Sequence, residues 1–234
     1  MEANLDGVKL DIGNLSLEMR ELILNGAYEY KEKELCEKYL SAGDAVLEVG
    51  GAIGFLGLFC QKQIGITRYA TVEANPRTME LLRKNYELNS LKPTVWNMAL
   101  AEADGTIELN LGTNFWEDSI VAASQQSRGP KVSVPSATLE TLLNKADFRA
   151  NVLLLDVEGA EKYINFDHVT GNIDKIIIEL HPRVLGHDTT YRIVSRLMAH
   201  GFEVAEEARH TFVFLKRDRQ KPETLHANVR ATAS

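Results

Sequence analysis

The chain has 234 residues, of which 44% are hydrophobic and 25% are charged, and its formal net charge is −7. This balance is typical of a soluble globular protein and argues against a disordered or membrane chain. The acidic net charge also argues against general attraction to nucleic-acid backbones. A chain of this length is expected to form a single domain, residues 1–234.

The first 14 residues lack the basic start and the long apolar run of a secretory signal. No apolar stretch of the sequence approaches transmembrane length. Cys36 and Cys60 fall in segments with helical spacing, where free thiols usually behave as small buried hydrophobes. The expectation is a cytoplasmic protein that does not associate with membranes.

The amino-terminal half predicts helices and parallel strands in alternation. Apolar residues at three- and four-residue spacing predict helices at 15–24 and 30–40. Short apolar runs that end at glycine or acid predict buried strands at 45–49 and 68–72, the second followed by Glu73. Further helices are expected at 55–63 and at 76–89, where Pro76 occupies the first turn.

The second half continues the alternation with one interruption. Strands are expected at 93–100, 151–156, 175–180, 202–206 and 211–215, helices at 137–145 and 189–200, and an antiparallel ribbon at 105–111. The fold class is therefore α/β: a seven-stranded, mostly parallel sheet with helices on both faces and a ribbon and loop insertion. We expect a helical segment over 1–43, a core over 44–216 and a loose polar tail over 217–234.

Open α/β sheets bind ligands beyond the carboxyl ends of their strands. The first strand leads into Leu47-Glu48-Val49-Gly50-Gly51-Ala52-Ile53-Gly54, where glycines allow the backbone to approach a ligand. A plain tight turn is the structural alternative for this loop. Glu73 ends the next strand, where a carboxylate can accept both ribose hydroxyl hydrogens of a nucleoside. A solvent-facing glutamate is the alternative there.

Glu48 helps to choose between nucleotides. A carboxylate at the glycine loop suits a positively charged ligand better than a pyrophosphate. The loop also lacks the spacing of a dinucleotide fingerprint and of a P-loop. S-adenosylmethionine, which carries an ammonium and a sulfonium, fits this pattern.

Six motifs together resemble the class I methyltransferases, with a Rossmann-like sheet, and within them the FkbM family. The motifs are Tyr28-Glu29, the loop Glu48 to Gly54, Val72-Glu73-Ala74-Asn75-Pro76, Asn97-Met98-Ala99-Leu100 with Asp104-Gly105, Leu155-Asp156-Val157-Glu158-Gly159-Ala160-Glu161, and Ile178-Glu179-Leu180-His181. They span roughly residues 28 to 181. The first motif departs from the family pattern, with Glu48 for the usual aspartate and Gly51-Ala52 for Ala-Asn.

The resemblance implies S-adenosyl-L-methionine as the cofactor and O-methylation of a small molecule or a glycan sugar. It implies that Glu48 and the backbone around Gly50 and Gly54 hold the methionine part and Glu73 the ribose, with Ala99 and Leu100 beside adenine. The expected cofactor-binding residues are Glu48, Gly50, Ala52, Gly54, Glu73, Ala74, Ala99 and Asp156. Core packing is the alternative role for Ala99 and Leu100.

Methyl transfer from a sulfonium is a direct displacement that requires alignment and exclusion of water. A hydroxyl acceptor also benefits from a base, and the expected catalytic residues are Asp156, His181 and Glu158, which end the fourth and fifth strands. His181 could instead be a satisfied loop residue before Pro182. No metal site is assigned, although a hard ion such as Mg²⁺ at Asp156, Glu158, Glu161 and Glu179 stays open beside a helix-capping role for Glu161.

Residues 110–135, with Asn114, Trp116, Glu117 and Asp118, are too long for a minimal connection and are expected to shape the acceptor site. Trp116 could stack on a sugar ring or anchor the loop. A catalytically silent nucleoside-binding scaffold and a nicotinamide-dependent oxidoreductase are the rival functions. Nucleic-acid methylation is disfavoured, since no Asn-Pro-Pro-Tyr type motif follows the fourth strand. Whether the amino-terminal helices cover the site or form a homo-oligomer is left open.

Overall fold

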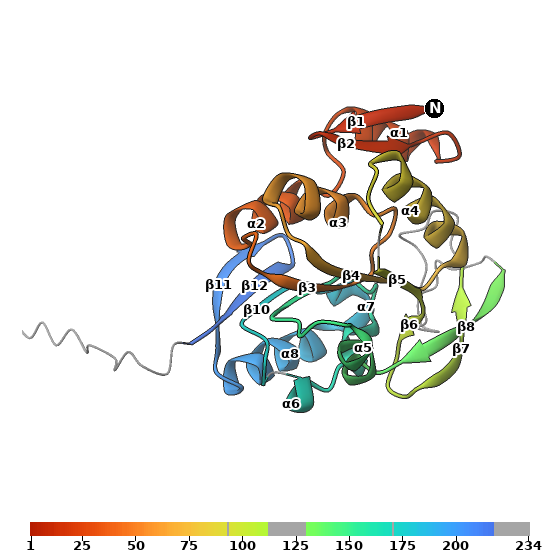
Figure 1. The fold of residues 1–234 in the computed structure, drawn as a ribbon. Coiled ribbons are helices and arrows are strands. Elements are labelled where there is room, and N and C mark those ends of the chain that lie inside the picture. Colours follow the sequence, from red (N-terminus) through yellow and green to blue (C-terminus); the bar gives the residue numbers. More distant parts are fainter. Residues whose placement is uncertain (93, 112–129, 170, 218–234) are drawn as a thin grey trace, which may run out of the picture.

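The computed structural model describes residues 1–92, 94–111, 130–169 and 171–217. A seven-stranded sheet forms its centre, in the order β11-β12-β10-β9-β3-β4-β5 (Figure 1). The strands are β3 (Ala45–Val49), β4 (Arg68–Glu73), β5 (Thr94–Asn97), β9 (Val152–Leu155), β10 (Lys175–Glu179), β11 (Phe202–Ala208) and β12 (Thr211–Lys216). Neighbours from β10 to β5 pair in parallel, whereas β12 pairs antiparallel with β10 and β11. This confirms the predicted sheet.

Alternate residues of the central strands pack into different cores, because successive side chains of a strand point to opposite faces. Leu153 joins one apolar cluster, while its neighbour Leu154 joins another on the opposite face. Both faces are buried, which explains why these strands are continuous apolar runs.

Figure 1 shows helices on both faces. One face carries α2 (Tyr30–Tyr39), α3 (Phe55–Phe59) and α4 (Pro76–Leu88), and the other carries α5 (Leu139–Lys145), α6 (Phe166–Val169), α7 (Pro182–Leu185) and α8 (His187–Ala199).

The amino-terminal segment contains a hairpin in addition to the two expected helices. Residues 2–11 form an antiparallel hairpin of β1 (Glu2–Leu5) and β2 (Val8–Asp11), followed by α1 (Leu17–Leu24). Asp6 and Gly7 both have left-handed backbone angles, with φ of 48° and 82°, as a two-residue hairpin turn requires. The two helices predicted within 1–43 are therefore confirmed, whereas the hairpin that precedes them was not predicted.

The insertion forms a second small sheet in the order β6-β8-β7. Its strands are β6 (Ala99–Leu100), β7 (Gly105–Asn110) and β8 (Lys131–Ala137). The predicted strand 93–100 is thus divided between two sheets, with Met98 between β5 and β6. The predicted helix 55–63 is also divided, since a π-helical turn (Cys60–Ile64) follows α3. A 3₁₀ turn (Ala160–Tyr163) follows β9.

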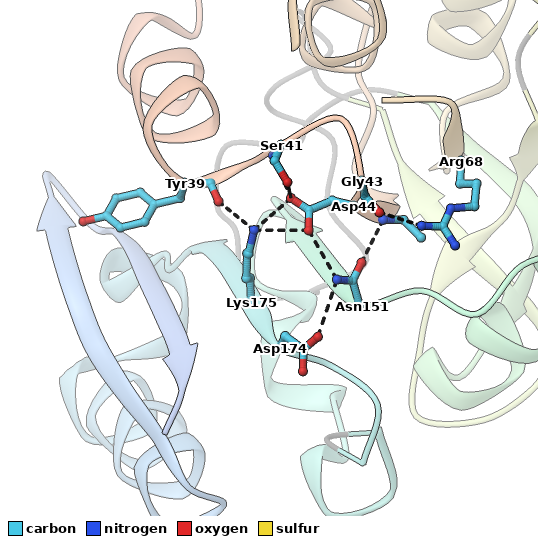
Figure 2. Close-up of polar contacts among 9 residues, drawn as sticks. Tyr39, Ser41, Gly43, Asp44, Arg68, Asn151, Asp174 and Lys175 are labelled. Atoms are coloured by element: carbon cyan, nitrogen blue, oxygen red, sulfur yellow. Dashed lines mark hydrogen bonds and ion pairs between the residues drawn. The ribbon is translucent and has the colours of Figure 1, made fainter. Parts of the chain in front are cut away.

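A polar network fastens the beginnings of the parallel strands (Figure 2). The Lys175 ammonium donates to both oxygens of Asp44, at 3.1 and 2.8 Å, and to the Tyr39 carbonyl at 2.9 Å. The Asn151 amide donates to Asp44 at 3.2 Å, and its Oδ1 accepts from the Ala45 amide at 2.7 Å. The network therefore joins β3, β9 and β10 at the end opposite to their carboxyl ends.

Cys36 and Cys60 are both free and buried in one apolar cluster, as expected. Among the described residues, no helix is both long enough and apolar enough to cross a bilayer.

Candidate functional site

A cavity of about 370 Å³ lies at the carboxyl ends of β3, β4 and β9. This is the edge at which open α/β sheets bind their ligands. The lining includes six carboxylate side chains and, among the described residues, no lysine, arginine or histidine. The six carboxylates are Glu18, Glu29, Glu73, Asp156, Glu158 and Glu179. The cavity therefore suits a ligand with positive charge or with hydroxyl donors.

The glycine loop forms one wall of the cavity. The amides of Gly50 and Gly51 both donate to the Val72 carbonyl, at 2.9 and 3.0 Å. Gly50 has a φ of 93°, and a Cβ atom at this position would overlap the backbone carbonyl of Asp156. Ala52 follows with a φ of 45°, which places a second left-handed residue in the loop. The turn therefore brings the chain against β9 in a way that only glycine permits at residue 50.

Glu73 is held rigidly at the end of β4. Its Oε2 accepts from the Ala52 amide at 2.9 Å, and its Oε1 accepts from the Asn75 amide at 2.7 Å. The Asn97 side chain donates to the carbonyls of Glu73 and Ala74, both at 2.8 Å. Backbone amides therefore fix the orientation of the carboxylate, whose two oxygens act as acceptors.

Of the eight expected cofactor-binding residues, six line the cavity, namely Gly50, Ala52, Glu73, Ala74, Ala99 and Asp156. The structure does not bring Glu48 and Gly54 into this lining. Glu48 is 3% exposed and accepts from the Thr71 hydroxyl at 2.8 Å beneath the glycine loop. Burial raises the pKa of Glu48 to about 7, although the Thr71 hydroxyl acts in the opposite direction. Gly54, with a φ of 84°, starts α3 beside Leu82 and Tyr86.

The expected catalytic residues are close together. His181 Nε2 lies 3.5 Å from Asp156 Oδ1, 3.4 Å from Glu158 Oε2 and 3.9 Å from Glu179 Oε1. On the other side of the ring, Nδ1 lies 2.5 Å from Oε1 of the fully buried Glu161. Glu161 therefore orients the imidazole and does not cap a helix.

This crowding changes the acidity of the group. Loss of hydration raises the pKa of Asp156 to about 6, of Glu179 to about 7 and of Glu158 to about 8. Burial lowers the pKa of His181, but the Glu161 hydrogen bond and the surrounding carboxylates outweigh it and raise that pKa to about 10. Near neutral pH, His181 is therefore positively charged, and the neighbouring carboxyl groups are partly protonated.

The amino-terminal segment contributes to the cavity, in agreement with one of the two roles left open for its helices. Glu18, Met19 and Leu22 from α1 contribute to the lining, as do Tyr28 and Glu29 before α2. Met19 and Tyr28 are buried in the cluster that also holds the hairpin. The apolar spacing of 15–24 revealed the helix, but its position over the cavity depends on tertiary packing. Asn114, Trp116, Glu117 and Asp118 lie outside the described residues, as does the tail beyond residue 217.

Comparison with known proteins gives a fold and a short sequence match. No family model matches the sequence. Ribosomal protein L11 methyltransferase from Thermotoga maritima is 31% identical over 74 residues, which are 31% of this chain and 28% of that protein. The match therefore spans less than a third of the relative.

Among solved structures, ribosomal protein L11 methylase from Lactobacillus delbrueckii subsp. bulgaricus has a TM-score of 0.50 at 11% identity, over 82% of this chain and 80% of that one. Methyltransferase FkbM from Methylobacillus flagellatus reaches 0.46 at 14% identity, over 75% of this chain and 44% of that one. The similarity to the first structure shows a shared Rossmann-like fold, and the second value is too low to support an argument.

Proposed function

We propose that the protein is an S-adenosylmethionine-dependent methyltransferase. The observation that carries the proposal is the cavity beside the glycine loop, with Glu73 held at its wall by two backbone amides. The fold shared with a methylase and the short match to a methyltransferase support it. Membership of the FkbM family and a cytoplasmic location are further predictions from the sequence.

The lining fits this cofactor in charge and in shape. Glu73 would accept hydrogen bonds from the ribose hydroxyls, and Ala74 and Ala99 would leave room for a flat base beside it. Gly50 and Ala52 would present backbone to the methionine part, and Asp156 would face its ammonium. The carboxylates, with no basic side chain among the described lining residues, would repel a pyrophosphate. A nicotinamide dinucleotide therefore fits this cavity less well.

We further propose O-methylation of a hydroxyl on a small molecule or a glycan sugar. When bound, the cofactor supplies an electrophilic methyl group. Asp156 and Glu158 line the cavity where an acceptor would enter and would accept the hydroxyl proton. His181 contacts both carboxylates and, as the third expected catalytic residue, would tune their basicity. The carboxylates would also disfavour a nucleic-acid acceptor, whose phosphates carry the same charge.

Calorimetric titration with S-adenosylmethionine, S-adenosylhomocysteine and NAD tests the proposal. We expect the first two ligands to bind and NAD to fail. Glu73→Gln should weaken binding of both by roughly ten- to a hundredfold, because a charged hydrogen-bond acceptor is worth about 1.5–3 kcal/mol. Glu203→Gln, at an exposed site in β11, is the matched control and should bind as the wild type.

Binding of NAD alone would overturn the proposal in favour of an oxidoreductase. Binding of S-adenosylmethionine with no methyl transfer to any hydroxylated acceptor would favour the silent scaffold. An acceptor screen with a radiolabelled methyl group, over hydroxylated metabolites and glycans, separates the scaffold from the enzyme.

A further inference from the structure

We propose that Asp156, Glu179 and His181 bind a divalent metal ion of the Mg²⁺ or Mn²⁺ type beside the cavity, whose lining includes Asp156 and Glu179. One ligand atom from each of these residues lies within 4.8 Å of the others. Glu158 Oε2, 3.4 Å from His181 Nε2, is a fourth oxygen at the same place. Binding of the ion does not depend on the proposed function, whereas its role toward an acceptor rests on it.

The distances around Nε2 favour an ion over a hydrogen bond. An N–H···O hydrogen bond is about 2.7–3.2 Å long, and the oxygens of Asp156, Glu158 and Glu179 lie at 3.5, 3.4 and 3.9 Å. Ligands about 2.1 Å from an octahedral ion are about 3.0 Å apart when adjacent and about 4.2 Å apart when opposite. The observed separations fall within this range, so a single ion could contact all of these atoms.

The other ring nitrogen of His181, Nδ1, supports the same metal site. Nδ1 of His181 lies 2.5 Å from Glu161 Oε1, so a neutral ring that donates Nδ1–H to Glu161 has its lone pair on Nε2. Three carboxylates surround this nitrogen, and their charge requires a cation there: either the proton that the raised pKa of His181 retains, or a divalent ion that binds the lone pair in its place. A carboxylate that orients the outer nitrogen of a histidine is the usual outer contact of a metal-binding imidazole.

Glu161 adds a second buried acidic oxygen beside His181. Its side chain is 0% exposed, and its Oε2 has no hydrogen-bond partner among the described residues. A buried carboxylate is costly unless cations or donors compensate it. An ion bound to His181 would increase the acidity of Nδ1–H and strengthen its bond to Glu161.

The ion would also fit an acceptor that presents oxygen. Asp156, Glu158 and Glu179 line the cavity, so a hydroxyl of a bound acceptor could complete the coordination. Coordination lowers the pKa of a hydroxyl. In the transfer, Glu158 in its ionised form would accept the hydroxyl proton, while the new C–O bond forms, the S–CH₃ bond breaks and the sulfonium is left as a neutral thioether. Acceptors with two adjacent hydroxyls would be favoured.

Titration of the purified chain with MnCl₂, followed by the electron paramagnetic resonance of free Mn²⁺, tests the site. We expect one equivalent to bind, with electron spin-echo modulation from a directly coordinated imidazole nitrogen. Glu179→Gln should weaken binding at least about tenfold, and His181→Gln should abolish the nitrogen modulation. Glu161→Gln, at a positioning residue, should weaken binding by about ten- to a hundredfold and should retain the modulation.

Matched controls use the same changes away from the cavity, Glu203→Gln at an exposed position and His200→Gln at a partly buried one, and should leave binding unchanged. Failure of the folded wild type to take up Mn²⁺ at millimolar concentration would overturn the proposal, and so would binding that survives both Glu179→Gln and His181→Gln. The cofactor titration is a separate test. If the protein binds S-adenosylmethionine but not Mn²⁺, only the metal site is overturned. If it binds Mn²⁺ but not S-adenosylmethionine, only the methyltransferase function is overturned.

Discussion

Gly50 and Asp156 lie so close together that no other residue fits at position 50. The glycine φ is 93°, and a Cβ atom would overlap the Asp156 carbonyl. Gly50→Ala should therefore displace the loop from β9, lower the free energy of unfolding by several kcal/mol and abolish cofactor binding. Urea denaturation and calorimetry measure the two effects.

Gly43→Ala is the control for this change. Position 43 lies in a turn where an added Cβ has no neighbour within 4 Å. The variant should unfold within about 0.5 kcal/mol of the wild type. If Gly50→Ala and Gly43→Ala had the same free energy of unfolding, the close contact at Gly50 would be contradicted.

Lys175→Met should destabilise the fold by about 3 kcal/mol at neutral pH, because the 94% buried Asp44 side chain would lose its cation. Burial raises the pKa of Asp44, but hydrogen bonds from Lys175, Ser41 and Asn151 outweigh it and leave that pKa below its usual value. The stabilisation is therefore present above about pH 4 and is lost as the pH falls further. The difference in urea midpoint between the wild type and Lys175→Met should be smaller at pH 3 than at pH 7.

The exposed pair Lys131 and Glu108, whose side chains are 61% and 67% exposed, is the control. Lys131→Met should cost less than about 1 kcal/mol at either pH. If Lys175→Met destabilises the protein no more than Lys131→Met does, the network of Figure 2 contributes little to stability.

Glu48→Gln should change how stability depends on pH. The pKa of Glu48 is raised to about 7, so the native state retains a proton that the unfolded chain releases near pH 4.5. This contribution is complete below pH 4.5 and is lost as the pH rises through 7. Relative to Glu48→Gln, the wild type should lose about 2 kcal/mol between pH 5 and pH 8. Urea denaturation across this pH range measures the free energy of unfolding of both proteins. The same pH dependence in the two proteins would contradict the raised pKa.

Asn85→Ala should release the amino-terminal hairpin. Asn85 is 0% exposed; its Oδ1 accepts from the Asp11 amide at 2.7 Å, and its Nδ2 donates to the Ile53 carbonyl at 2.8 Å. Loss of both bonds should cost about 2 kcal/mol and speed hydrogen exchange in residues 2–11. Asn144→Ala, on an exposed helical position, should change neither quantity.

The central sheet was predictable because both of its faces are buried. Val152–Leu155 and the three isoleucines inside β10 form uninterrupted apolar runs, and each run is followed directly by an acidic residue. The same signal located Glu73, Asp156 and Glu179 at one edge of the sheet. The free cysteines were predicted for a related reason, since both follow the apolar spacing of helices.

Other elements depend on contacts that the sequence does not reveal. β8 contains Pro135 and polar residues, and it is a strand only because β6 and β7 pair with it on both sides. The hairpin is different, because Asp6-Gly7 between short apolar runs is a local turn signal that could have been used. Glu48 was expected to face the ligand because it begins the glycine motif. Strand alternation instead directs it toward Thr71, beneath the loop.

The outer edge of the sheet limits how copies of the chain could associate. Among the described strands, β11 pairs with β12 alone, and its register shifts between Val204 and Glu206. Glu203, Glu206 and Glu207 lie along the same strand. A second copy that extended the sheet here would place like charges opposite one another on an irregular backbone, which is how natural proteins prevent edge-to-edge aggregation. Any homo-oligomer of this chain should therefore use a different surface.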